Sequence, residues 1–320
     1  MPGIDEHTLL MLHFDDSSED SSQYRQTVTS TGAAFSTDAK FGVAAAGSFA
    51  AQKGFRIANN PNLNFGTGDF TIDCWVKFND VTAGYQPIFD RRGAQDPFGY
   101  LLTVETTNDL RFYAGDGSSW AVNMTIGSIA AYQNQYIHVA IVRNGAVFTL
   151  YINGQAAATA TSDVNIVAVE QDPMIGVGSS NISAGLTSAY YLHGVLDELR
   201  VSNVARWTSN FTPPAQPYSP PVEAPRIKAP ASAISGKTFL VSWTAVADAA
   251  SYTLEQQVDG GSWEQVYTGA ATSWQAAAEG KTMGFRVKAA DGDGNESEYA
   301  QSGEVKIFPS LEGKILGGVI

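Results

Sequence analysis

The strongest structural signal lies in residues 136–154, which read Tyr136-Ile-His-Val-Ala-Ile-Val-Arg143, Asn144-Gly145, Ala146-Val-Phe-Thr-Leu-Tyr-Ile152 and Asn153-Gly154. Runs of β-branched and aromatic residues are bounded here by two Asn-Gly pairs. Asn-Gly is the preferred pair for a two-residue type I′ hairpin turn, because both positions of that turn require a positive φ. The stretch therefore predicts three consecutive antiparallel strands.

Other segments of the first 212 residues repeat the strand pattern. In Phe70–Phe78, apolar residues alternate with Thr71, Asp73, Trp75 and Lys77, which predicts a strand with one buried face. Residues 101–105 and 110–114 flank Asn108-Asp109 and predict another hairpin. No segment of ten residues has a convincing helical period, so we predict an all-β protein built from two stacked antiparallel sheets.

Prolines divide the chain. Six of the 13 prolines fall between positions 213 and 225, a density that neither a helix nor a central strand tolerates. We therefore expect a domain over residues 1–212, a stiff proline-rich linker over 213–225, a second domain over 226–308 and an apolar tail over 309–320. Expected strands of the second domain are residues 238–245, 252–257, 263–268, 283–289 and 304–308.

Composition restricts the function. The formal net charge is −13, which argues against binding nucleic acid or docking on an anionic membrane surface. Cys74 is the one cysteine, so there is no internal disulfide framework and no cysteine-based zinc site. Because we find neither a secretory signal nor a transmembrane span, we expect a protein made in the cytoplasm and released by lysis.

Residues 8–214 resemble a concanavalin A-like lectin/glucanase domain of the LamG-type jelly roll. The resemblance rests on an ordered series of short motifs, among them Leu10-Met-Leu-His-Phe-Asp15, Phe65-Gly-Thr-Gly-Asp-Phe-Thr-Ile72, Leu150-Tyr-Ile-Asn-Gly154 and Gly194-Val-Leu-Asp-Glu-Leu-Arg-Val-Ser202. The domain is similar to those of tailed-bacteriophage virion proteins.

Residues 222–308 resemble a fibronectin type III domain, a smaller immunoglobulin-like sandwich. Trp243 stands where that family has its core tryptophan on the second strand. Met283 occupies the usual tyrosine-corner position, so the bond from that hydroxyl to the backbone is absent.

The first resemblance implies a structural Ca²⁺ held by acidic residues of the first-strand region and of the last strand. Asp197 alternates with Val195, Leu199 and Val201 and so leans toward a buried face, while Asp20 follows the first strand. Asp20 and Asp197 are the candidate ligands. The alternative is that Asp197 accepts hydrogen bonds from the protein and that residues 15–20 form a solvated loop.

Saccharide binding is the other site that the resemblance implies. The sequence does not select among its possible stacking platforms, which are Trp120, Tyr132, Tyr190, Tyr191 and Trp207. Arg91 and Arg92 could meet an acidic ligand or lie in a solvated turn. The histidines His13 and His138 are expected to pack within strands, and Cys74 to be a core thiol.

A glycoside hydrolase is the least favoured reading. Hydrolysis needs two carboxylates about 5–9.5 Å apart, and the glucanase pattern of two glutamates on one strand face is missing. Asp197 and Glu198 are adjacent, and adjacent strand residues point to opposite faces. We therefore predict no enzymatic activity.

The expected function is that of a virion decoration or fibre protein of a tailed phage, displayed on the particle surface in many copies. Its partners would be capsid or tail proteins, with host-surface polysaccharide as a further ligand. The tail could dock on a neighbouring subunit through Leu311, Ile315 and Leu316. The alternative is a bacterial surface or secreted carbohydrate-binding protein.

Overall fold

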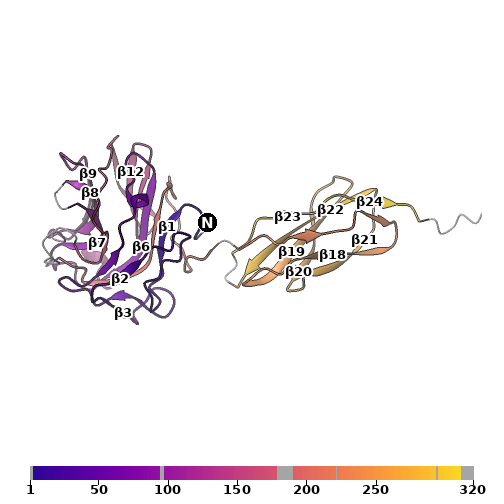
Figure 1. The fold of residues 1–320 in the computed structure, drawn as a ribbon, viewed down its shortest axis with the longest axis horizontal. Helices are drawn as coiled ribbons and strands as arrows, with labels where there is room; N and C mark the ends of the chain where they lie inside the picture. Colours follow the sequence, from indigo (N-terminus) through magenta and orange to yellow (C-terminus); the bar gives the residue numbers. More distant parts are fainter. Residues whose placement is uncertain (1–2, 94–96, 179–189, 221, 293–294, 311–320) are drawn as a thin grey trace, which may run out of the picture. The chain divides into compact units, whose positions relative to one another are not determined.

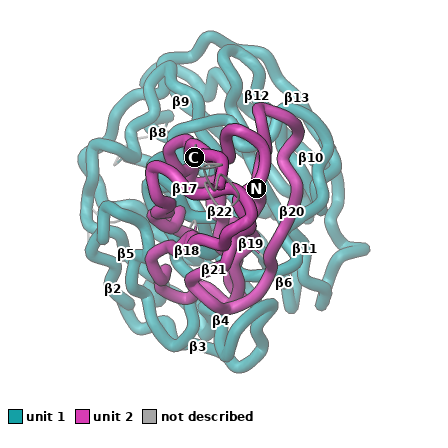
Figure 2. Tube along the Cα trace, turned by 90° about the vertical axis from the view of Figure 1, so that its right-hand side faces the viewer, with its two compact units in different colours: residues 1–219 teal, residues 220–320 magenta. Residues whose placement is uncertain are grey.

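The computed structural model describes residues 3–93, 97–178, 190–220, 222–292 and 295–310. They divide into two compact units, unit 1 (Met1–Ser219) and unit 2 (Pro220–Ile320), which Figure 2 colours teal and magenta. The fold is all-β, as the sequence predicted. Within the described ranges, no helix is long and apolar enough to span a membrane.

Unit 1 is a sandwich of two sheets. The eight-stranded sheet has the order β13 (Gln155–Thr161), β12 (Val147–Ile152), β11 (Tyr136–Asn144), β6 (Phe70–Phe78), β15 (Gly194–Ser202), β4 (Ala45–Gly47) and β3 (Ala34–Ser36), and β1 (Thr8–Leu12) also pairs with β15. The seven-stranded sheet has the order β10 (Val122–Ser128), β9 (Asp109–Asp116), β8 (Phe98–Val104), β7 (Gln86–Arg92), β14 (Met174–Ile175), β5 (Phe55–Ile57) and β2 (Val28–Ser30). Figure 1 shows β7 and β8 in one layer and β6 and β1 in the other. Two short 3₁₀ turns, η1 (Pro61–Leu63) and η2 (Ala130–Tyr132), lie in the connections.

The core of unit 1 lies between these sheets. The apolar residues of β6 face β8 and β9, where Phe70 stacks near Tyr100 and Phe112. Tyr100 is buried and donates its hydroxyl to the Leu63 carbonyl at 3.0 Å. Cys74 lies in this core, and burial raises the pKa of its thiol, so it is the inert core thiol that the sequence predicted.

The opposite face of β6 is also buried, which the sequence did not predict. Residues 203–219, here called the strap, lie on the outer face of the eight-stranded sheet. Trp207 and Phe211 of the strap stack at 3.9 Å and contact His138, which is fully buried. The expectation of a single buried face was therefore wrong, because alternation cannot show that a distant segment covers the polar side.

The strap is held by a buried ion pair. Arg200 of β15 donates to the Asp73 carboxylate of β6 with an Nε–Oδ1 distance of 3.1 Å. The hydroxyl of Tyr218 bonds both groups, and Ile4 donates its amide to the Ser219 carbonyl at 2.9 Å. Residues 213–219, expected in the linker, therefore pack on unit 1.

Unit 2 contains two sheets around Trp243, Phe285 and Met283. One has the order β16 (Ile227–Lys228), β18 (Thr238–Trp243) and β21 (Ser273–Ala277). The other has the order β17 (Ser232–Ile234), β24 (Val305–Phe308), β22 (Thr282–Asp291), β19 (Ala249–Val258) and β20 (Glu264–Gly269), and β23 (Ala300–Gln301) also pairs with β22. All five strands expected here are present, whereas β16, β17, β21 and β23 were missed. The resemblance to fibronectin type III stays a prediction.

Candidate functional site

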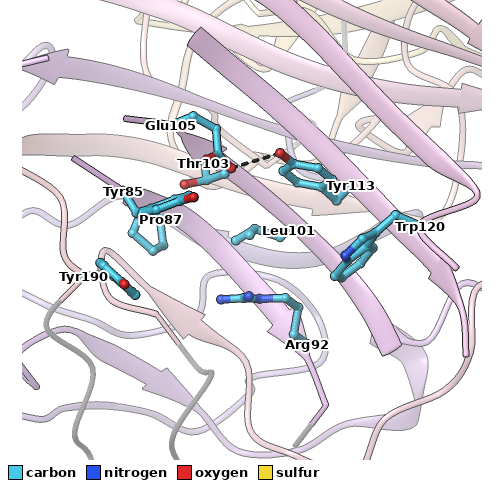
Figure 3. Close-up of a pocket in the computed structure, with 9 residues that line it drawn as sticks. All are labelled: Tyr85, Pro87, Arg92, Leu101, Thr103, Glu105, Tyr113, Trp120 and Tyr190. Atoms are coloured by element: carbon cyan, nitrogen blue, oxygen red, sulfur yellow. Dashed lines mark hydrogen bonds between the residues drawn. The ribbon is translucent and has the colours of Figure 1, made fainter. Parts of the chain in front are cut away.

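A pocket of about 440 Å³ opens on the outer face of the seven-stranded sheet. We call it the sheet pocket (Figure 3); its lining is Tyr85, Pro87, Arg92, Leu101, Thr103, Glu105, Tyr113, Trp120 and Tyr190. Its volume is that of a typical small-ligand site.

Strand alternation places these side chains. Along β8, Tyr100, Leu102 and Val104 face the core, so Leu101 and Thr103 face outward into the pocket, and Glu105 continues that row directly after the strand. Tyr113 of β9 lies opposite Leu101, and Pro87 of β7 lies opposite Thr103. The expected strand 101–105 already carried this signal, because Leu101, Thr103 and Glu105 share parity. Sequence reasoning nevertheless missed Glu105, Tyr85 and Tyr113.

Four aromatic rings surround the pocket in two pairs. Tyr85 and Tyr190 meet edge to face with centroids 5.1 Å apart, and Tyr113 and Trp120 are tilted at 5.5 Å. Figure 3 shows Tyr85 and Tyr190 on one side of Leu101 and Tyr113 and Trp120 on the other. Tyr85 is 40% exposed and Tyr190 46%, so their rings remain accessible to a ligand.

Glu105 is the acidic group among the described lining residues. Its side chain is in the buried class at 8% exposure, and it accepts a hydrogen bond from the Tyr113 hydroxyl at 3.0 Å. The negative charge of Glu105 raises the pKa of Tyr85, and burial together with that charge raises the pKa of Tyr113. Both phenols therefore stay protonated as donors.

The two neighbouring arginines have different roles. Arg91 is buried and donates to Asn59 Oδ1 at 2.8 Å and to the Val169 carbonyl at 2.9 Å, so it braces loops inside unit 1. Arg92 lines the sheet pocket, and its guanidinium makes two bonds with the Asp90 carboxylate, at 3.0 and 2.7 Å. Of the pair, only Arg92 reaches the pocket.

The structure places the five candidate saccharide-stacking residues in different environments. Trp120 and Tyr190 line the sheet pocket. Tyr132 and Tyr191 pack against the core of unit 1, and Trp207 is a buried residue of the strap itself. All five are aromatic residues that sequence alone does not rank, so only the tertiary arrangement distinguishes them.

Asp20, one candidate Ca²⁺ ligand, is fully occupied by protein donors. Oδ1 accepts the amides of Met11 and Ser22, each at 2.9 Å, and Oδ2 accepts the Ser22 hydroxyl and the Gln26 amide, each at 2.8 Å. A carboxylate has about four acceptor positions, so none is left for a cation. Asp20 fixes a turn.

Asp197, the other candidate, also faces amides. Its Oδ2 accepts the Lys40 and Phe41 amides at 2.7 and 3.0 Å, and Asp15 Oδ1 accepts the Val43 amide at 2.8 Å. A cation would require oxygen ligands where this loop presents N–H groups. In the described part of the chain, no three His, Cys, Asp or Glu side chains gather as a metal site. The geometry therefore does not fit the Ca²⁺ that the resemblance implied.

A bulge in β15 explains how Asp197 is placed. Glu198 has a φ of 52°, and Asp197 pairs with Trp75 while Arg200 pairs with Asp73, so two residues of β15 lie opposite Cys74. Asp197 thus lies on the outer face, whereas Leu199 lies in the core. The expectation that these two residues share a face was wrong, because the bulge reverses the alternation.

The same bulge gathers other titratable groups. Glu198 accepts the Tyr218 amide at 2.7 Å and contacts His13 Nδ1 at 2.7 Å. His13 is half-buried, as expected of a packing residue. The site is covered by the strap and the 38–44 loop, so it holds structure together. The predicted docking residues Leu311, Ile315 and Leu316 lie outside the described residues.

Comparisons with known proteins agree on the fold. A family model described as the concanavalin A-like lectin/glucanases superfamily matches residues 49–209. No curated protein matches the chain.

The similar solved structures include the following two. Domain 4 of AbnA, a GH43 extracellular arabinanase from Geobacillus stearothermophilus, solved with arabinotriose, is 19% identical with a TM-score of 0.46, covering 62% of this chain and 93% of that one. The binding domain of botulinum neurotoxin serotype D is 14% identical with a TM-score of 0.49, covering 63% and 48%.

Proposed function

Because this chain belongs to the concanavalin A-like lectin/glucanase superfamily, we propose that unit 1 binds a saccharide in the sheet pocket. The observation that supports this most directly is that four aromatic rings and the carboxylate of Glu105 line one pocket. Ring faces pack against the C–H faces of a sugar, and a carboxylate accepts bonds from its hydroxyls. A few placed polar groups in an aromatic pocket are the usual composition of a small-ligand site.

Binding without hydrolysis is the activity we propose. Glu105 is the one acid among the described lining residues, and the next carboxylate on this face, Asp90, is held by Arg92. Asp90 lies opposite Leu101, four residues before Glu105, which is about 13 Å along a strand. Glycosidases hold their two carboxylates about 5–9.5 Å apart.

Loss of a stacking ring tests the proposal. Trp120→Ala and Tyr190→Ala should each weaken binding of a saccharide found by a glycan screen about tenfold, measured by calorimetry. Tyr24→Ala is the matched control, because Tyr24 is a similarly exposed ring (39%) outside the pocket lining. Equal affinities for the three variants and the wild type would exclude this pocket.

The biological setting remains the one proposed from the sequence: display on a phage particle, with capsid or tail proteins as partners. It is supported by the resemblance to phage domains. Quantitative mass spectrometry of density-purified particles tests it, since a decoration protein would approach the copy number of the major capsid protein and a fibre would be present in a few copies. Absence from the particles would favour the alternative, a bacterial surface or secreted lectin.

A further inference from the structure

We propose that the saccharide taken by the sheet pocket carries a free amino group, and that its ammonium lies against Glu105. This inference rests on the proposed function and narrows its ligand to an amino sugar.

Charge compensation is the first argument. Among the ion pairs of the described residues, none includes the Glu105 carboxylate, which accepts a hydrogen bond from the Tyr113 hydroxyl and also interacts with the Tyr85 hydroxyl. Arg111 acts on Glu105 through its charge but does not form an ion pair with it. Burial of a carboxylate without a directly bonded counter-charge is unfavourable. A ligand ammonium would supply the missing charge.

The two arginines near the pocket already form ion pairs with other acidic residues. Arg92 is bonded to Asp90, and Arg111 donates to the Tyr113 hydroxyl at 3.2 Å and to Asp109 at 3.4 Å. Each arginine is thus bonded to an acid other than Glu105, so Glu105 forms no ion pair of its own.

The ring arrangement is the second argument. Tyr85 and Tyr113 are neutral rings beside the Glu105 carboxylate, and Trp120 and Tyr190 line the same pocket farther from it (Figure 3). A cation is attracted to the face of a phenol or indole ring, an attraction that a neutral hydroxyl lacks. Carboxylate and rings therefore favour the same ligand group, an ammonium.

A matched ligand pair tests the inference. Wild-type protein is titrated calorimetrically at about pH 6 with the trimer of β-1,4-glucosamine and with the trimer of N-acetylglucosamine, which have the same skeleton. We expect the free-amine trimer to bind at least about tenfold more tightly, as for a charge-assisted hydrogen bond, and the ratio to fall as salt is added.

Two variants that remove the same charge test whether the preference for the amine depends on Glu105. The net charge of −13 attracts any cationic ligand, so Glu105→Gln is compared with Glu264→Gln, which removes the same charge from an exposed position in unit 2. We expect the preference for the amine to fall to about one in Glu105→Gln and to remain in Glu264→Gln.

The remaining outcomes contradict either the amino-sugar inference alone or saccharide binding as a whole. If the acetylated trimer binds as tightly as the amine, or if the two variants behave alike, the amino-sugar inference is wrong and saccharide binding stands. If neither trimer nor any glycan of the screen binds the wild type, the proposed function fails as well. The wild-type ratio decides the inference even if Glu105→Gln does not fold.

Discussion

Asp197 is a buried carboxylate that the protein does not fully satisfy. Its Oδ2 takes two amides, while its Oδ1 has no hydrogen-bond partner. Burial raises its pKa to about 7, against the amide bonds, which lower it, and the charges of Glu198 and Asp15 add to the rise. Below about pH 7 this carboxyl is therefore mostly protonated.

Its neighbours are shifted in the same direction. Burial raises the pKa of Glu198; for His13 burial opposes protonation, but the bond to Glu198 outweighs it and the pKa is raised. A raised folded-state pKa gives stability that is present at low pH and lost as the pH rises through that pKa. Unit 1 should therefore be more stable near pH 5 than near pH 8.

Asp197→Asn tests this assignment, because asparagine keeps an acceptor for the two amides and cannot ionise. Between about pH 5 and about pH 8 the Tm of the wild type should fall by about 5 °C relative to that of the variant. The measurement is thermal unfolding followed by circular dichroism at several pH values. Parallel curves for the two proteins would contradict the role of Asp197.

At the scale of elements, the turn between β12 and β13 and the strap pack against each other. Both Asn-Gly turns of the β11–β13 meander have glycines at positive φ, 58° at Gly145 and 75° at Gly154. A Cβ at Gly145 would meet nothing within 4 Å, whereas one at Gly154 would lie 1.9 Å from the Phe211 carbonyl oxygen. Gly154 is thus required for two reasons: the turn needs a positive φ, and the strap residue Phe211 packs too closely for a Cβ.

The two glycines form a matched pair for mutation. Gly145→Ala should cost about 1–2 kcal/mol, the strain of a left-handed residue with a Cβ. Gly154→Ala should cost several kcal/mol in total, because Phe211 must also move. Urea unfolding of each variant gives the two values, and equal losses would show that the strap does not rest on this turn.

The sequence predicted the strands and turns better than it predicted which segments pack against them. The range Phe70–Phe78 matches β6 at both ends, and the Asn-Gly pairs gave the β11–β13 meander, because alternation and turn chemistry are local. The burial of Asp73 and the position of Asp197 depend on a strap and a bulge, which have no local signature. Strand parity was sufficient to group Leu101, Thr103 and Glu105, but the rings near them come from β9 and from three separate segments outside the strands.

For the whole molecule, composition placed the boundary close to the observed one. The proline-rich stretch suggested 212, whereas unit 1 extends to Ser219. The difference is due to Tyr218, a residue with 7% exposure whose hydroxyl bonds Asp73 and Arg200. Proline density cannot reveal that a tyrosine in the stretch has a buried polar partner.

The boundary can be tested with shortened chains. A chain that ends at residue 219 should unfold at the temperature of unit 1 in the full protein. One that ends at 212 leaves the Arg200–Asp73 pair without the Tyr218 hydroxyl and should lose at least about 2 kcal/mol. Equal stability of the two chains would place the boundary at 212.

The bond between the Ile4 amide and the Ser219 carbonyl bears on how the protein is made. It joins segments that leave the ribosome about 215 residues apart, and contacts of such long sequence separation form slowly. During synthesis β1 therefore cannot pair with its partner strand until nearly all of unit 1 has emerged, because that partner, β15, is among the last strands of the unit. Translation of unit 2, which follows unit 1 in the sequence, gives unit 1 time to complete this contact.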